Sequence, residues 1–99
     1  MNNDEVINGD IYESTEGFST CDLYLASFLQ AVGVKMLKAN RDHKTKRVYF
    51  VFEKNETMHE LRLNYFSREA KVDALTYADN IKSLKSLCHN ITTSSMVPR

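Results

Sequence analysis

The chain has 99 residues, which is enough for one ordinary domain with a single core and too few for two. Hydrophobic residues make up 42% of the sequence, so a packed core is expected rather than global disorder. No apolar run approaches the roughly 18–20 residues that a membrane helix needs, and the acidic first five residues do not resemble a secretory signal.

The net charge of zero hides a strong asymmetry along the chain. Residues 1–34 carry six acids and no base, whereas residues 35–99 carry all thirteen bases and seven acids. Such polarity indicates an anionic partner or an acidic arm that screens a basic face. The only cysteines, Cys21 and Cys88, lie far apart and indicate reduced thiols of a cytoplasmic protein, although the sequence leaves a disulfide between them open.

Residues 1–10 lack any hydrophobic period and are expected to be a mobile acidic tail, followed by an extended segment that starts at Ile11. A helix is predicted that starts after residue 19 and continues through residues 23–32. Its N-cap is expected at Ser19, with Asp22 in the reciprocal position of a capping box. Gly33 is the residue type at which such a helix ends. Because most of its circumference is apolar, this helix is expected to be central.

After the first helix the hydrophobic period becomes that of strands. Residues 34–41 and residues 47–53 are predicted to pair as a β-hairpin through the polar connection 42–46. The second strand is apolar on both faces, because Val48, Phe50 and Phe52 alternate with a second apolar set. This pattern implies helices on both sides of the sheet, or a second subunit on one side.

Two further helices are predicted after the hairpin. The first spans residues 55–66, with Thr57 and Glu60 at capping-box spacing. The second begins at the N-cap Asp73 and is expected to stop at Asn90. Its apolar seam consists of Tyr77, Ile81, Leu84 and Cys88.

The predicted fold is therefore α+β, in the order α-β-β-α-α, with an antiparallel β-hairpin packed with three helices. The sequence divides into an acidic disordered tail (residues 1–10), a single domain (residues 11–91) and a second disordered tail (residues 92–99).

Catalytic, cofactor and metal motifs are not found in the sequence. Three glycines cannot make a phosphate-cradling loop, and neither Gly-x-Ser-x-Gly nor Ser-x-x-Lys occurs. The three histidines have no metal-ligand spacing with each other or with the cysteines. Glu56 and Glu60 lie one turn apart and are interpreted as partners of a helix dipole. We therefore expect a protein that is not an enzyme and binds no cofactor or metal.

Basic residues form two clusters that could contact a phosphate backbone. The hairpin cluster consists of Lys35, Lys38, Arg41, Lys44, Lys46 and Arg47. The cluster on the last helix consists of Lys82, Lys85 and His89. The alternative interpretation is that lysines on edge strands and solvated helix faces serve solubility and block strand pairing. The hairpin has no interleaved aromatic residue, which weakens any sequence-specific interpretation.

A second class of function is a protein–protein interaction module. Tyr49 and Val51 lie on the spare apolar face of the second strand and would form the interface of a homodimer.

Three stretches carry a family resemblance, and they read STCDLYLASFL at residues 19–29, RVYFVF at 47–52, and KVDALTY followed by IKSLKSL at 71–77 and 81–87. Together they resemble a small bacterial and phage domain family whose function is not established, over roughly residues 12–89. The resemblance implies a stand-alone cytoplasmic accessory protein of phage or mobile-element origin and supplies no catalytic residues. We therefore expect association with DNA or RNA through the basic hairpin, with the homodimeric module as the alternative.

Overall fold

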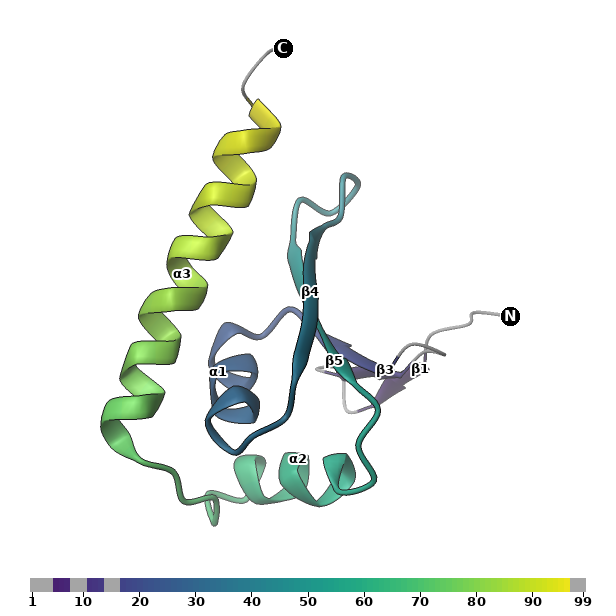
Figure 1. Ribbon diagram of the computed structural model, residues 1–99. Helices are drawn as coiled ribbons and strands as arrows, with labels where there is room; N and C mark the ends of the chain where they lie inside the picture. The colour runs from purple at the N-terminus through teal and green to yellow at the C-terminus, as the bar shows by residue number, and fades with distance from the viewer. Residues whose placement is uncertain (1–4, 8–10, 14–16, 97–99) are drawn as a thin grey trace.

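The computed structural model describes residues 5–7, 11–13 and 17–96. Its elements in chain order are β1 (Glu5–Ile7), β2 (Ile11–Glu13), β3 (Gly17–Thr20), α1 (Leu23–Ala31), β4 (Met36–Arg41), β5 (Val48–Glu53), α2 (Met58–Phe66) and α3 (Ala74–Met96). The strands form one antiparallel sheet in the order β1-β2-β3-β5-β4 (Figure 1). The predicted α+β class, the hairpin and its three helices are confirmed. The sequence analysis did not predict that β1, β2 and β3 extend the sheet on the other side of β5.

The sheet is organised around β5, which pairs with β3 on one side and with β4 on the other. Phe50 lies opposite Thr20 in β3 and opposite Ala39 in β4. Gly17 begins β3, and a Cβ atom there would collide with the carbonyl oxygen of Phe52. Glycine is therefore required for β3 to approach β5 this closely.

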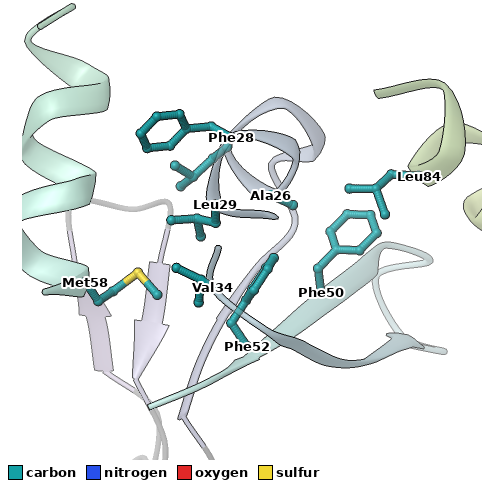
Figure 2. Close-up of a cluster of buried hydrophobic side chains, with 9 residues drawn as sticks. Ala26, Phe28, Leu29, Val34, Phe50, Phe52, Met58 and Leu84 are labelled. Carbon is teal, nitrogen blue, oxygen red and sulfur yellow. The ribbon is translucent and has the colours of Figure 1, made fainter. Parts of the chain in front are cut away.

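The core lies between the sheet and the helices. Phe50 and Phe52 on β5 contact a cluster of buried side chains to which every helix contributes, together with Val34 from the α1–β4 connection; the helix residues are Leu25, Ala26, Phe28, Leu29, Met58 and Leu84. Figure 2 shows Leu84 of α3 pointing toward the ring of Phe50. Because the helix residues all meet the Phe50 and Phe52 side of the sheet, the first of the two alternatives, helices on both sides, is wrong for the described residues. The second alternative, another subunit on the open side, stays a prediction.

Helix α1 is the central element, as its sequence predicts. Five consecutive residues from Leu25 to Leu29 are buried, so the middle of the helix is covered around its circumference. The sheet covers one side and α3 covers another. Two side chains of α3 hold α1 from that side, because the Tyr77 hydroxyl donates to the Tyr24 carbonyl (3.4 Å) and the Asn80 amide donates to the Ser27 carbonyl (3.2 Å).

The start of α1 differs from the prediction. Asp22 is the N-cap, and its Oδ1 accepts hydrogen bonds from the backbone N–H groups of Tyr24 (3.0 Å) and Leu25 (3.1 Å). Ser19 lies instead in β3, opposite Val51. Ser19 cannot be the N-cap because the pairing of β3 with β5 continues through Thr20 and keeps the backbone extended. The helix can therefore begin only after Thr20.

The end of α1 is where the sequence places it. The Gly33 N–H donates to the Gln30 carbonyl and the Val34 N–H donates to the Leu29 carbonyl, each at a distance of 3.0 Å. These two bonds form a Schellman motif, with Gly33 at a φ of 98°.

The predicted N-cap of α3 is confirmed, because Asp73 Oδ2 accepts from the Thr76 N–H (2.9 Å) and from its hydroxyl (2.8 Å). The predicted stop at Asn90 is wrong, since α3 continues to Met96. Helix-compatible residues follow Asn90, and Pro98 is the first strong breaker in the sequence. Among the described residues no helix is both long and apolar enough to cross a bilayer.

Two expected tails therefore contain regular structure. Residues 5–7 form β1, which pairs with β2, so the expectation of a mobile segment over 1–10 is wrong for these three residues. Residues 92–96 belong to α3, so the expected disorder is wrong for them as well. The remaining parts of both predicted tails, 1–4, 8–10 and 97–99, lie outside the described residues.

Candidate nucleic-acid interface

The tip of the β4–β5 hairpin is held in one conformation by Asp42. Its backbone N–H donates to the Arg47 carbonyl (2.8 Å), and its own carbonyl accepts from the Lys46 N–H (2.7 Å). Its carboxylate accepts from the Lys44 N–H (3.0 Å) and from the Thr45 hydroxyl (3.1 Å). These bonds lower the pKa of Asp42 below its ordinary value of 3.8, with the Lys44 backbone bond as the largest cause. The turn is therefore built by an ionised carboxylate.

The backbone of Lys46 has a φ of 67°, in the left-handed region that favours glycine. A lysine at such a position costs about 1–2 kcal/mol relative to the right-handed region. The chain keeps a basic side chain where glycine would fit with less strain.

The tip presents its side chains to solvent. Residues 43–47 are all exposed, and three of the five are bases: Lys44, Lys46 and Arg47. Figure 1 shows the hairpin tip extending beyond α1, at the end of the sheet away from α2. These three bases lie within four residues at the end of a two-stranded ribbon, and we call this segment the hairpin tip.

Arg47 is also tethered to the body of the protein. Its Nη1 lies 3.7 Å from the Sγ of Cys21, in hydrogen-bonding geometry. This contact joins the start of β5 to the β3–α1 junction, because Cys21 follows the strand that pairs with β5. The base of the tip is thereby fixed relative to the core.

The strand register separates the other bases of the predicted hairpin cluster. Lys38 lies opposite Val51 and therefore on the sheet face away from the helices. Arg41 lies opposite Val48 on the helix side, where it is half-buried and its Nε is shielded from solvent. Lys35 precedes β4, at the opposite end of the hairpin from the turn. The structure thus brings together three of the six predicted residues.

The second predicted cluster belongs to a different surface. Lys82, Lys85 and His89 are exposed, and their helical positions place them on the side of α3 away from the buried Leu84. Leu84 points toward Phe50 of the sheet (Figure 2). The helical period therefore places the three bases on the sides of α3 that do not face the sheet. The hairpin tip and the basic side of α3 therefore do not form one continuous face.

The two predicted interface residues lie on the sheet face without helices. Val51 is only 7% exposed, and Tyr49 on the same face is half-buried. Lys38 and Asn40 of β4 lie opposite them and share this face. Much of the apolar surface expected at these two positions is therefore already covered within one chain.

The groups considered for metal or nucleophilic chemistry do not converge in the described residues. Cys21 and Cys88 are both free and half-buried, and burial raises the pKa of the Cys88 thiol. His43, His59 and His89 are exposed on the hairpin, α2 and α3 respectively. Across the described ranges, no three of the His, Cys, Asp and Glu side chains form a metal-binding group.

One buried charge and the role of Asp42 were not predicted from the sequence. Arg62 of α2 is 4% exposed, and its buried Nη1 makes no hydrogen bond to the described part of the chain. Its position one turn after the buried Met58 is the signal that could have identified it. Asp42 could have been identified because an Asp side chain in a turn often accepts a hydrogen bond from the backbone N–H group two residues later, which here belongs to Lys44.

Comparison with known proteins identifies the family and goes no further. Residues 15–90 match the family described as a domain of unknown function, DUF5659, and the chain belongs to it. No curated protein matches the chain. No solved structure matches it either.

Proposed function

We propose that this DUF5659 protein is a non-catalytic accessory protein that binds nucleic acid through its hairpin tip. The observation that carries the proposal is the exposed turn of residues 43–47, which brings Lys44, Lys46 and Arg47 close together at the end of a braced ribbon. Positive side chains that contact phosphates supply most of the affinity in sequence-independent binding. The strained backbone of Lys46 supports the proposal, because strain that is kept at one residue often accompanies a functional role.

The proposal includes a cytoplasmic location. The free thiols of Cys21 and Cys88 support it, because disulfides persist mainly in oxidising compartments. A phage or mobile-element origin is part of the same proposal, and sequencing the neighbouring genes tests it.

Fluorescence anisotropy with labelled DNA and RNA at two salt concentrations tests the binding. Three phosphate contacts give a slope of log affinity against log salt of about −2.7, and so about a 40-fold loss between about 50 and about 200 mM salt. The double variant Lys44→Glu with Lys46→Glu should weaken binding by at least about tenfold at the lower salt concentration.

The matched control is Lys54→Glu with Lys71→Glu. Both lysines are exposed and lie outside the tip, Lys54 just after β5 and Lys71 between α2 and α3. The double variant changes the net charge by the same amount and should lose much less affinity. Absence of binding at low salt, or equal losses in the two double variants, would overturn the proposal.

A second candidate is a homodimer that pairs the sheet face carrying Tyr49 and Val51. The favouring observation is that the helix side chains of the core all pack on the opposite face of β5. Light scattering coupled to gel filtration tests this candidate. A dimer that persists at high salt and dissociates in Tyr49→Glu would support it, and a monomeric wild-type protein would exclude it.

A further inference from the structure

The shape and side chains of the hairpin tip bear on which class of nucleic acid it fits. This inference rests on the proposed function and names the ligand class for the same surface. We infer that the tip binds duplex DNA without sequence preference, with the two-stranded ribbon at the major groove and its lysines on the flanking phosphates.

The residue types at the tip argue against single strands. Proteins that bind single strands combine a basic groove with several aromatic rings on which successive bases stack. In the exposed turn the only ring is the imidazole of His43. The nearest aromatic residue along β5 is Tyr49, which is half-buried on the open sheet face. The tip therefore offers charge without a stacking platform.

The rigidity of the turn favours a ligand with regularly spaced charges. The Asp42 carboxylate fixes the Lys44 backbone and the Thr45 hydroxyl, and the Arg47 N–H donates to the same hydroxyl oxygen (3.3 Å). The Arg47 guanidinium is held near Cys21 at 3.7 Å. A braced turn backbone suits phosphates that a duplex also holds in place, because only the lysine side chains, and not the turn itself, then lose conformational freedom on binding.

The dimensions of a β-ribbon select among duplexes. The major groove of B-form DNA, about 12 Å wide, admits a two-stranded ribbon. The major groove of A-form RNA is deep and too narrow for side chains to read. Duplex DNA is therefore the better match for the β4–β5 hairpin.

The choice of lysine indicates contacts with phosphates rather than bases. Lysine is a flexible point charge, whereas arginine has the planar fork that pairs with guanine through two bonds. Lys44 and Lys46 flank Thr45, and the one arginine of the tip, Arg47, is held by Cys21 at the base of the turn. The tip should accordingly bind unrelated duplex sequences with similar affinity.

Anisotropy titrations with a labelled DNA duplex, its separate strands and an RNA duplex of the same sequence test the inference. We expect the DNA duplex to bind at least about tenfold more tightly than either alternative at about 50 mM salt. A scrambled DNA duplex should bind within about threefold of the original, because phosphate contacts carry no sequence information. A saturating minor-groove ligand should leave binding unchanged.

Nuclear magnetic resonance provides a readout that does not depend on any variant folding. Addition of the DNA duplex should shift the amide signals of residues 42–48 and leave those of residues 58–66 in α2 unchanged. Equal or tighter binding of single strands or RNA would overturn the duplex inference and leave the proposed function intact. Displacement by the minor-groove ligand, or shifts confined to other elements, would also overturn the inference, and no binding of any nucleic acid would overturn both proposals.

Discussion

The hydroxyl of Thr45 donates a hydrogen bond to the carboxylate of Asp42 over 3.1 Å, and this contact closes the turn that carries the basic hairpin tip. The only acid in the segment between Lys35 and Arg47 is therefore the residue that builds the turn. Its negative charge is directed at the turn's own backbone and hydroxyl groups. The arrangement of the three exposed bases depends on this one carboxylate.

The first prediction concerns pH. Because the folded-state pKa of Asp42 is held below 3.8, its contribution to stability is complete above 3.8 and is lost as the pH falls through the lowered value. Carbon-detected nuclear magnetic resonance should show the Asp42 carboxyl titrating below pH 3.8. The Lys44 amide should lose its hydrogen-bonded shift over the same pH range. A carboxyl that titrates at or above its ordinary value would contradict the role given to Asp42.

The second prediction separates the charge of Lys46 from its backbone strain. Lys46→Gly removes one base and relieves the left-handed conformation, so the free energy of unfolding should stay equal or rise by up to about 1 kcal/mol. The salt slope of DNA binding should fall in magnitude by about 0.9. Urea denaturation and anisotropy measure the two quantities.

Lys44→Gly is the matched comparison, since it removes the same charge from the same turn. Lys44 does not have a positive φ, so glycine there only adds flexibility to the unfolded chain. Stability should fall by about 0.5–1 kcal/mol. If the two glycine variants have the same stability, the strain assigned to Lys46 does not exist.

The third prediction tests how α3 is attached to the body. Leu84 is 2% exposed and packs with Phe50, whereas Leu75 on the same helix is 76% exposed. Leu84→Ala should lower the free energy of unfolding by about 2–5 kcal/mol. Leu75→Ala makes the same chemical change and should alter it by no more than about 0.5 kcal/mol. Urea denaturation of both variants decides the point, and similar losses would mean that α3 packs through a different face.

The fourth prediction concerns the buried guanidinium of Arg62. A buried polar group without a hydrogen bond costs about 1–3 kcal/mol. Arg62→Met keeps much of the side-chain volume and removes the charge, so it should stabilise the protein by about 1–3 kcal/mol, or about 4–24 °C in Tm. Thermal unfolding measures the change. Arg68→Met is the control, because Arg68 is exposed just beyond the same helix and its replacement should leave Tm nearly unchanged. A lower Tm for Arg62→Met would show that Arg62 has a stabilising partner.

Local chemistry predicted much of this fold. Three features were predicted from residues that are close in sequence. They are the helix end at Gly33, the N-cap at Asp73 and the apolar seam that includes Leu84. The hairpin follows from strand period and from a polar connection between residues 41 and 48. These features depend on side chains that are close in sequence, so the sequence alone was sufficient to locate them.

Other boundaries depended on partners distant in the chain. Ser19 is a residue type that often caps helices, but its pairing with Val51 places it in β3. Asp22 is the N-cap instead. The three-residue strands β1 and β2 have no period long enough to recognise in the sequence. Strand pairing depends on partners distant in the chain, which explains why β1 was not predicted and why the extended segment expected from Ile11 was not placed in the sheet.

The candidate site divides in the same way. The sequence by itself determined that the hairpin is basic and that its connection is polar. Only the tertiary structure decided which bases act together. Strand alternation sends Lys38 and Arg41 to opposite faces, and the packing of Leu84 against Phe50 turns Lys82 and Lys85 away from the sheet. The physical reason is that burial of the apolar side chains fixes the orientation of each strand and helix. That orientation then decides toward which surface each charged side chain points.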